Sequence, residues 1–385
     1  MMVSRTGALA AWMLVWAGAA TGASEPAPGP PPAAQAAPTE TTGAASDDEE
    51  SAVQEMQSRA RDLQPLVKTG AAREFLSAAE CLPRIEKRVL YRNRAKGVAL
   101  TAAEFAALPE GERADLTEFP CDETFYYYTG YGSPLMYARP LDLLAQRADL
   151  GTFSGLTIVD FGYGTVGHLR MLASLGAQAT GIEVSPVLKA LYSQPGDTGK
   201  IRACAGAFAG AGTGVGEHAD GRITLVDGRF PADGAAVKDV RDGGPAGGYD
   251  VFISKNTLKR GYIHPARAVD ERMLVKLGVE DAQFCASVFE MLKPGGWFMI
   301  YNLCPAQNPE DKPYLPHADG ESPFPRAMLE KAGFEVVEFD RVDTESALDY
   351  WMALGFNAGK PRDEVAKDLR VWWTLCRRPM ERATK

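Results

Sequence analysis

The sequence predicts a three-layer α/β fold, in which a seven-stranded sheet lies between two layers of helices, with a helical N-terminal cap. Over residues 155–377, short apolar segments alternate with amphipathic ones, as strands and helices do in such a fold. A glycine-rich turn follows the first apolar segment, and the residues before it have helical periodicity. We therefore expect one α/β domain over residues 151–380, preceded by a helical cap and an aromatic lid segment over residues 53–150.

The amino end has the layout of a secretory signal peptide. Residues 1–23 contain one charge, Arg5, followed by an apolar run from Gly7 to Ala20 and then small residues. The run is too short to span a bilayer comfortably, so an uncleaved anchor is the weaker alternative. We expect an exported protein, periplasmic or secreted, with no stable membrane span after signal cleavage.

Residues 24–52 are rich in proline and alanine and carry six acidic residues but no lysine or arginine. This composition buries too little apolar surface to fold, so a disordered spacer is expected. The chain has a net charge of −9, and Arg5 with the spacer accounts for −5, which leaves −4 for the remainder. Such a balance predicts no nucleic-acid partner. Arg84, Arg88 and Arg92 are spaced as one face of a helix, which we interpret as a solvated face.

Six cysteines are present: Cys81, Cys121, Cys204, Cys285, Cys304 and Cys376. None of them is spaced C-x-x-C and the chain has only four histidines, so no metal site is expected. In an oxidising compartment, a disulfide between Cys81 and Cys121 would close a loop worth ~4 kcal/mol of chain entropy. The pairing stays open at this point.

The elements are expected in the following order. The cap has helical patterns at residues 71–79 and 102–108, and an apolar helix covers residues 135–145. Strands are predicted at residues 156–161, 178–183, 223–227, 249–254, 297–303, 334–340 and 369–377. Helices are predicted at residues 167–175, 282–292 and 325–332, and another begins with Ser185 as its N-cap. Residues 196–221, rich in glycine and alanine, are expected to form a surface loop.

The strongest motif is Asp-Phe-Gly-Tyr-Gly-Thr-Val-Gly at residues 160–167, where a predicted strand leads through G-x-G-x-x-G into a helix. Gly162, Gly164 and Gly167 let the backbone approach a ligand closely. Glu183 ends the next strand, where a carboxylate can accept both ribose hydroxyls. Dinucleotides and S-adenosylmethionine both fit this geometry. Asp160 disfavours a nearby pyrophosphate and suits the ammonium and sulfonium of S-adenosylmethionine.

On these residues, the segment 155–377 resembles the class I S-adenosylmethionine-dependent methyltransferases. The similarity is carried by residues 160–167, 181–183 and 292–298, and by a closing hairpin at 333–340 and 371–374. It implies that the glycine loop holds the methionine part of the cofactor and that Glu183 holds its ribose. It also places Asp227 near the adenine, although the spacing of residues 226–231 departs from the family pattern.

Residues 254–265 form a polar, basic segment after the fourth strand, where such a fold places substrate chemistry. Methyl transfer is an in-line displacement that needs positioning and a group to take a proton. His264 is the candidate base, because its unperturbed pKa is about 6.5. Lys255, Asn256 and Arg260 are candidates to bind an anionic or amide-bearing substrate. Alternatively, the polar residues of this loop satisfy its own backbone.

Residues 126–137 combine tyrosines, glycines and a proline just before the first strand of the domain. In many methyltransferases this stretch folds over the cofactor, and aromatic faces attract a sulfonium. We expect a lid in which Tyr131 contacts the cofactor, with aromatic core packing as the alternative. Tyr301 and Asn302, at the end of the fifth strand, are also candidates to face the site.

These features predict S-adenosylmethionine-dependent methyl transfer to an unidentified oxygen or nitrogen nucleophile of a small molecule or a protein. Two alternatives stay open. An exported, non-catalytic binding protein with this fold has weight, because S-adenosylmethionine is made in the cytosol. An NAD(P)-dependent oxidoreductase shares the first strand, turn and helix, but the closing hairpin and the Leu-Lys-Pro-Gly-Gly turn at residues 292–296 argue against it.

Overall fold

A computed structural model describes residues 51–204 and 219–380 of the chain. The predicted signal peptide and nearly all of the predicted spacer lie outside the described residues. Ser51 belongs to the folded part, because its hydroxyl accepts from the backbone of Gln54 and caps the first helix. Within the two described ranges, no helix is both long enough and apolar enough to cross a membrane.

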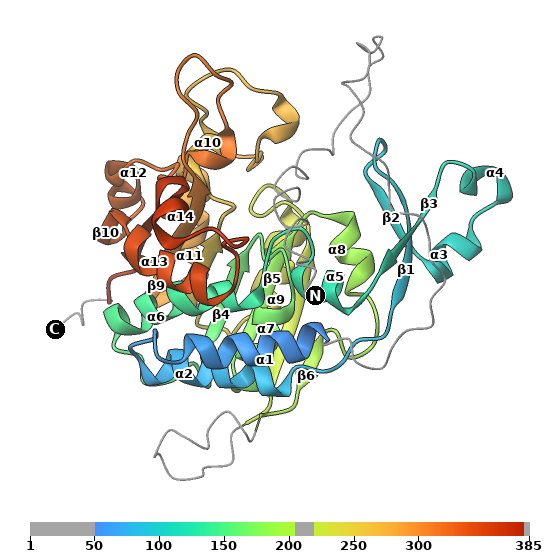
Figure 1. Cartoon of the computed structure of the whole chain (residues 1–385), viewed down its shortest axis with the longest axis horizontal. Helices are drawn as coiled ribbons and strands as arrows, with labels where there is room; N and C mark the ends of the chain where they lie inside the picture. The colour runs from blue at the N-terminus through green and yellow to red at the C-terminus, as the bar shows by residue number, and fades with distance from the viewer. Residues whose placement is uncertain (1–50, 205–218, 381–385) are drawn as a thin grey trace.

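The central sheet has eight strands in the order β10-β11-β9-β8-β4-β5-β7-β6 (Figure 1). The five central strands from β9 to β7 run parallel, while β11, β10 and β6 are antiparallel to their neighbours. The strand bounds are β4 (Thr157–Phe161), β5 (Gln178–Glu183), β6 (Gly199–Ile201), β7 (Gly221–Asp227), β8 (Tyr249–Lys255), β9 (Leu292–Pro305), β10 (Glu335–Val342) and β11 (Leu369–Arg377). All seven predicted strands are confirmed, and β10 with β11 forms the closing hairpin that the resemblance implies. The edge strand β6 lies in residues that we expected to be a loop.

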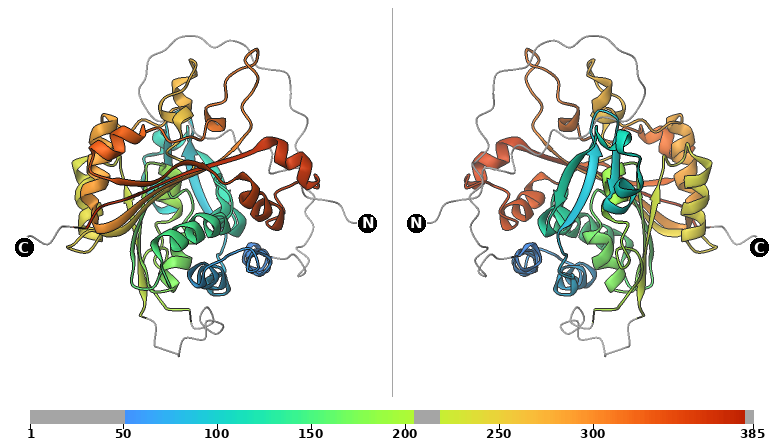
Figure 2. Two further views of the ribbon diagram at one scale, coloured as in Figure 1. Left: turned by 90° about the vertical axis from the view of Figure 1, so that its left-hand side faces the viewer. Right: turned by 90° about the vertical axis from the view of Figure 1, so that its right-hand side faces the viewer.

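Helices cover both faces of this sheet, which confirms the three-layer prediction (Figure 2). On one face α6, α7 and α13 pack into a core that also takes in α1 and α2 of the cap, and on the other face α9, α11 and α12 pack around a second core. The helix bounds are α1 (Ala52–Leu63), α2 (Gly70–Ser77), α3 (Ala102–Ala107), α4 (Glu110–Arg113), α5 (Glu123–Tyr128), α6 (Ala138–Ala148), α7 (Gly167–Ser174), α8 (Pro186–Leu191), α9 (Gly234–Gly243), α10 (Arg260–Ile263), α11 (Asp281–Met291), α12 (Arg326–Lys331), α13 (Thr344–Ala353) and α14 (Arg362–Asp368).

The cap contains the predicted helices and, in addition, an antiparallel sheet that the sequence pattern did not predict. This sheet has the order β2-β1-β3, with β1 (Arg88–Asn93), β2 (Val98–Thr101) and β3 (Thr117–Cys121). The predicted helical face of arginines is therefore wrong. Arg88 and Arg92 lie on β1, where Arg88 pairs with the buried Asp197 and Arg92 stacks on a phenylalanine ring. The Val-Leu-Tyr run between these arginines favours a strand over a helix.

A disulfide joins Cys81, at the end of the short 3-10 helix η2 (Ala78–Cys81) that follows α2, to Cys204, just after β6. The pairing of Cys81 with Cys121 that the sequence suggested is therefore not the one formed, and Cys121 is a free, buried thiol. Sequence distance favoured the nearer cysteine, whereas the fold returns the chain to the cap through β6. The bond fastens the cap to the edge of the central sheet.

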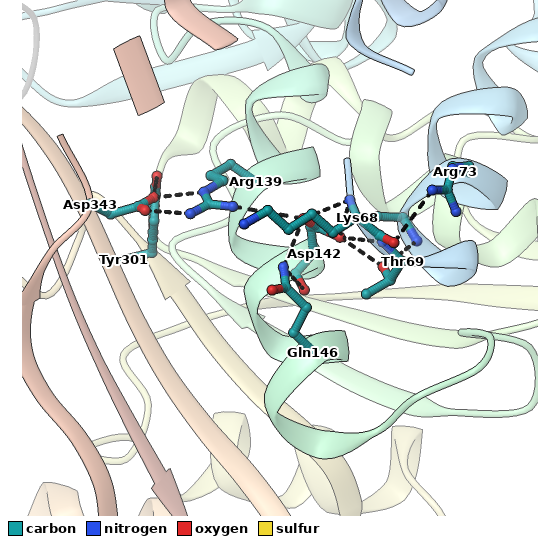
Figure 3. A network of polar contacts seen from close by, with 9 residues as sticks. Lys68, Thr69, Arg73, Arg139, Asp142, Gln146, Tyr301 and Asp343 are labelled. Atoms are coloured by element: carbon teal, nitrogen blue, oxygen red, sulfur yellow. Dashed lines mark hydrogen bonds and ion pairs between the residues drawn. The ribbon is translucent and has the colours of Figure 1, made fainter. Parts of the chain in front are cut away.

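A buried ion-pair network also fastens the cap to the sheet (Figure 3). Arg139 on α6 forms a bidentate pair with Asp343, with Nε 2.8 Å from Oδ2, and the hydroxyl of Tyr301 donates to the same carboxylate. Asp142, one turn along α6, accepts from two backbone amides just before α2.

Tyr301 thus ends in this network, and Asn302 donates to two backbone carbonyl oxygens. Both results correct the expectation that these side chains face the site.

Candidate functional site

The parallel strands bring four charged side chains to one edge of the sheet. Asp160, Glu183, Asp227 and Lys255 lie at or next to the carboxyl ends of β4, β5, β7 and β8. In register, Glu183 pairs with Asp227, and Asp160 pairs with the residue two before Lys255. Parallel α/β sheets bind their ligands at this edge, where the strand order changes direction.

The glycine loop between β4 and α7 is tightly covered by neighbouring segments. Gly162 and Gly164 have φ values of 77° and 58°, a conformation that favours glycine. A Cβ on Gly162 would collide with Thr257, and a Cβ on Gly164 would come within 2.8 Å of Cγ of Tyr131. Gly167 is covered in the same way by a proline of the aromatic segment. The aromatic segment therefore folds directly over the glycine loop, as expected of a lid; a contact of Tyr131 with a cofactor stays a prediction.

Asp160 is fully buried and its two carboxylate oxygens differ in their surroundings. Oδ2 accepts from the hydroxyl of Tyr137 and lies the same distance, 2.6 Å, from Nε2 of His168. Oδ1 has no hydrogen-bond partner within the described residues. Burial lowers the pKa of His168, so its neutral ring adds no positive charge beside Asp160 at pH 7. A buried carboxylate oxygen without a donor is costly, so this oxygen is a ready acceptor for a cationic ligand.

Tyr137 and His168 are functional candidates that the sequence did not single out. Their rings stack with centroids 3.6 Å apart, and both are buried. His168 directly follows the glycine motif, and this position in the sequence could have identified it as a candidate. Tyr137 ends the aromatic segment, but its bond to Asp160 depends on the three-dimensional packing.

Glu183 is buried at the end of β5, beside the glycine loop. Its Oε1 accepts from the amide of Val184 at 2.8 Å, and the amides of Gly164 and Ser185 also lie in bonding range. Burial raises the pKa of Glu183 to about 7, against the bonds from these amides. The carboxylate is therefore poised between its neutral and ionised forms near neutral pH.

The raised pKa of Glu183 predicts a pH-dependent effect on stability. The native state holds this proton more tightly than the unfolded chain, so the contribution is complete below pH 4.5 and is lost as the pH rises to about 7. The variant Glu183→Gln has no charge to bury. It should therefore gain roughly 2–3 kcal/mol relative to the wild type at pH 8 compared with pH 4.5. Thermal unfolding at both pH values measures this difference. The exposed Glu330→Gln serves as the control, and an equal shift in both variants would contradict the assignment.

Asp227 lies beside Glu183 but is less enclosed, with 40% of its side chain exposed, and it pairs with Lys189 on α8. The carboxylate of Asp227 is thus already engaged by Lys189. Its contact with the adenine stays a prediction. The cis peptide bond at Phe230–Pro231 follows in the segment whose spacing departs from the family pattern.

The structure separates the residues predicted to do substrate chemistry. Lys255 lies within the buried cluster, with Nζ 4.9 Å from the centroid of the Tyr137 ring. Asn256 serves the backbone instead, because its Oδ1 accepts from the amide of Leu303 at 2.7 Å. This arrangement matches the alternative in which the loop satisfies its own backbone. Lys259 does the same, donating to carbonyl oxygens of β9 and of the segment that follows it.

His264 lies outside the cluster, at the end of α10. Its Nε2 is 2.6 Å from a carboxylate oxygen of Asp281 at the start of α11, and half of its side chain is exposed. The pair borders a cavity of about 410 Å³. Arg260, at the start of α10, is paired with two carboxylates of the segment after β9. Tyr262 on the same helix lies within electrostatic range of Tyr131 of the lid.

No protein-family model matches the chain, and no curated protein matches it. Among solved structures, the chain is similar to the [4+2]-cyclase SpnF, with 17% identity, a TM-score of 0.33, and coverage of 63% of this chain and 80% of that one. It is similar to phosphoethanolamine N-methyltransferase 2 of Haemonchus contortus, in complex with phosphomonomethylethanolamine and S-adenosylhomocysteine, with 15% identity, a TM-score of 0.36, and coverage of 69% and 63%. A third is an S-adenosylmethionine-dependent methyltransferase of Mesorhizobium loti, with 18% identity, a TM-score of 0.32, and coverage of 61% and 96%. The fold assignment rests on the order and direction of the strands.

Proposed function

We propose that this chain, which has the fold of the class I S-adenosylmethionine-dependent methyltransferases, binds S-adenosylmethionine and transfers its methyl group to an oxygen or nitrogen nucleophile. One observation carries the proposal. Asp160 is a buried carboxylate with one oxygen that has no donor among the described residues, it stands directly before the glycine loop, and Glu183 ends the neighbouring strand. These groups fit the ammonium and the ribose of this cofactor.

The charge of the site favours S-adenosylmethionine over a dinucleotide. Asp160 and Glu183 supply up to two negative charges, and Lys255 is the buried cation that the described residues place in the cluster. With both carboxylates ionised, the net charge of −1 complements the +1 of S-adenosylmethionine. A pyrophosphate would instead bring two further negative charges to a buried cluster that is already net negative.

Each residue has a distinct part in the proposed reaction. When bound, the cofactor supplies an electrophilic methyl group. Asp160 would hold the ammonium, Glu183 would accept from the ribose hydroxyls, and the glycine loop would let the backbone approach the cofactor. Tyr131 covers the loop and excludes water. His264, which pairs with Asp281 outside this cluster, is the proposed acceptor of the nucleophile's proton.

The runner-up is an exported binding protein that keeps the fold without catalysis. The disulfide between Cys81 and Cys204 favours it, since disulfides persist in oxidising compartments, where S-adenosylmethionine is not made. The two proposals differ in one observable, the transfer of a methyl group.

Methyl transfer is tested with S-adenosylmethionine labelled in the methyl group and a panel of phenols, carboxylic acids, amines and peptides. With an accepted substrate, His264→Ala should lower turnover by about 100-fold or more and leave cofactor affinity unchanged, because a general base acts on the chemical step alone. His317→Gln is the matched control, because this histidine lies in the short η6 helix (Pro316–Ala318) and the described residues give it no carboxylate partner. Unchanged turnover in His264→Ala would remove it as the base. Cofactor binding without transfer to any acceptor would favour the binding protein.

A further inference from the structure

The cavity beside His264 has the size and the lining of a small-molecule site. Its volume is about 410 Å³, within the range of roughly 300–1,000 Å³ that such sites occupy. Its wall includes aliphatic side chains that pack on the second core but stay partly exposed: Ile263, Val275, Val279 and Met328. A ligand with an apolar body would cover this surface, and the burial would favour its binding.

The segment between α10 and α11, which forms one wall of the cavity, is held in place by its backbone. The amide of Val275 donates to the carbonyl oxygen of Tyr262 on α10 at 2.9 Å. Gly278 has a φ of 75°, and a Cβ at this position would come within 2.7 Å of Cβ of Ala232. The wall is therefore already formed without a ligand, which lowers the cost of ordering it on binding.

His264 gives this mainly apolar wall a hydrogen-bond acceptor without charge. His264 and Asp281 both line the cavity, and Nε2 of the histidine lies 2.6 Å from Oδ2 of the aspartate. In the neutral ring, the nitrogen that faces the carboxylate carries the proton, so Nδ1 keeps its lone pair. Nδ1 has no hydrogen-bond partner within residues 51–204 and 219–380. It can therefore accept a hydrogen bond from a hydroxyl group of a ligand.

The charged groups of the wall disfavour an anionic ligand. Lys276 pairs with Glu271 at 2.8 Å, and both side chains are exposed. Glu280 is exposed as well, and its side chain has no partner in the described ranges. Together with Asp281, these groups make the wall net negative. A carboxylate or phosphate would be repelled, whereas an ammonium gains little from exposed charges that water screens.

We propose that this cavity binds an uncharged molecule with an apolar body and a hydroxyl group that donates to Nδ1 of His264. The aliphatic wall selects the body, the ring nitrogen selects the hydroxyl, and the negative charge excludes anions. Binding in the cavity needs no cofactor. The inference also narrows the candidate methyl acceptors to neutral hydroxyl compounds, and this consequence rests on the proposed function.

Isothermal titration of the purified full chain without cofactor tests the inference with probes that share one body. The wild type should bind para-propylphenol at one site per chain. It should bind the methyl ether, para-propylanisole, about tenfold more weakly, the size expected for one lost hydrogen bond. The anion para-propylbenzoate and the cation para-propylbenzylamine should also bind more weakly than the phenol. This comparison needs no variant, so a variant that fails to fold does not block the test.

Two variants locate the site. His264→Ala should weaken binding of the phenol by about tenfold and leave the ether unchanged, so that the two ligands bind alike. Val279→Trp should weaken binding of both by about tenfold or more, because the indole fills the cavity. The controls are His317→Ala, in the short η6 helix, and Val337→Trp, on the exposed edge strand β10. Both controls should keep the wild-type affinities.

Equal wild-type affinity for the phenol and the ether would overturn the inference, as would tighter binding of either charged probe. Unchanged binding of the phenol by Val279→Trp would place the ligand elsewhere, and an equal loss of phenol and ether in His264→Ala would make the histidine structural; either result overturns the inference. A protein that binds S-adenosylmethionine but not the phenol would contradict this inference alone. Binding of the phenol without binding of S-adenosylmethionine would support it and count against the proposed function.

Discussion

Reduction of the disulfide between Cys81 and Cys204 should lower the free energy of unfolding by about 5 kcal/mol and the melting temperature by roughly 10 °C. The bond joins positions 123 residues apart, so the reduced unfolded chain gains a large amount of conformational freedom. The loop that it closes contains the lid, the glycine loop and Glu183. Reduction should therefore also weaken the framework of the candidate site.

The measurement is chemical denaturation with and without a thiol reductant, which can reach the exposed Cys81. The double variant Cys81→Ser, Cys204→Ser should have the lower stability in both conditions and show no response to reductant. If the reductant destabilises this variant as much as the wild type, the effect belongs to something other than this bond. A reduced wild type as stable as the oxidised protein would also contradict the prediction.

The disulfide between Cys81 and Cys204 bears on the compartment in which the protein acts. Disulfides form and persist outside the cytosol, and the predicted signal peptide points to the same place. We therefore keep export as a proposal. It makes the supply of S-adenosylmethionine the main question about the activity in the cell.

Arg139→Met should destabilise the protein by about 3–5 kcal/mol, the second-largest effect expected. The guanidinium neutralises Asp343 and faces Asp142, and all three side chains are buried. Removing it leaves two buried carboxylates without their cation, and the cap loses its link to β9 and α13. Denaturant unfolding measures the loss. Arg147→Met, on the same helix but half-exposed beside Glu338, should cost less than about 1 kcal/mol.

A second substitution distinguishes the loss of the ion pair between Arg139 and Asp343 from a simple loss of packing. Asp343→Leu in the Arg139→Met background removes a stranded carboxylate and should recover part of the lost stability, since matched apolar replacements of buried pairs are tolerated. No recovery, or an Arg139→Met protein as stable as Arg147→Met, would show that the charges do not determine the effect.

Local patterns predicted the central sheet well and the cap poorly. The strands β5 and β11 match the prediction residue for residue, because both are largely buried. Ser185 is the N-cap of α8, as expected from the proline that follows it. The cap strands are short and partly exposed, and the arginine spacing around β1 imitates a helix. Neither hydrophobic periodicity nor charge spacing identifies such strands.

The sequence identified residues of the candidate site only where a recognisable motif marks the end of a strand. Asp160 and Glu183 follow from the motif and its neighbouring strand. The bond from Tyr137 to Asp160 joins segments whose contact depends on the lid packing. The position of Lys255 at a strand end was predicted, but its place over the Tyr137 ring, within the field of Asp160, was not. The pairing of Cys81 with Cys204 likewise depends on the return of the chain through β6.

The central claim is that the chain binds S-adenosylmethionine at the carboxyl edge of its sheet. Isothermal titration with S-adenosylmethionine, S-adenosylhomocysteine and NAD tests it most directly. We predict that the first two bind with one site per chain, that NAD does not bind, and that Glu183→Ala weakens binding of both. Absence of binding of S-adenosylmethionine and S-adenosylhomocysteine to the folded wild type would contradict the account.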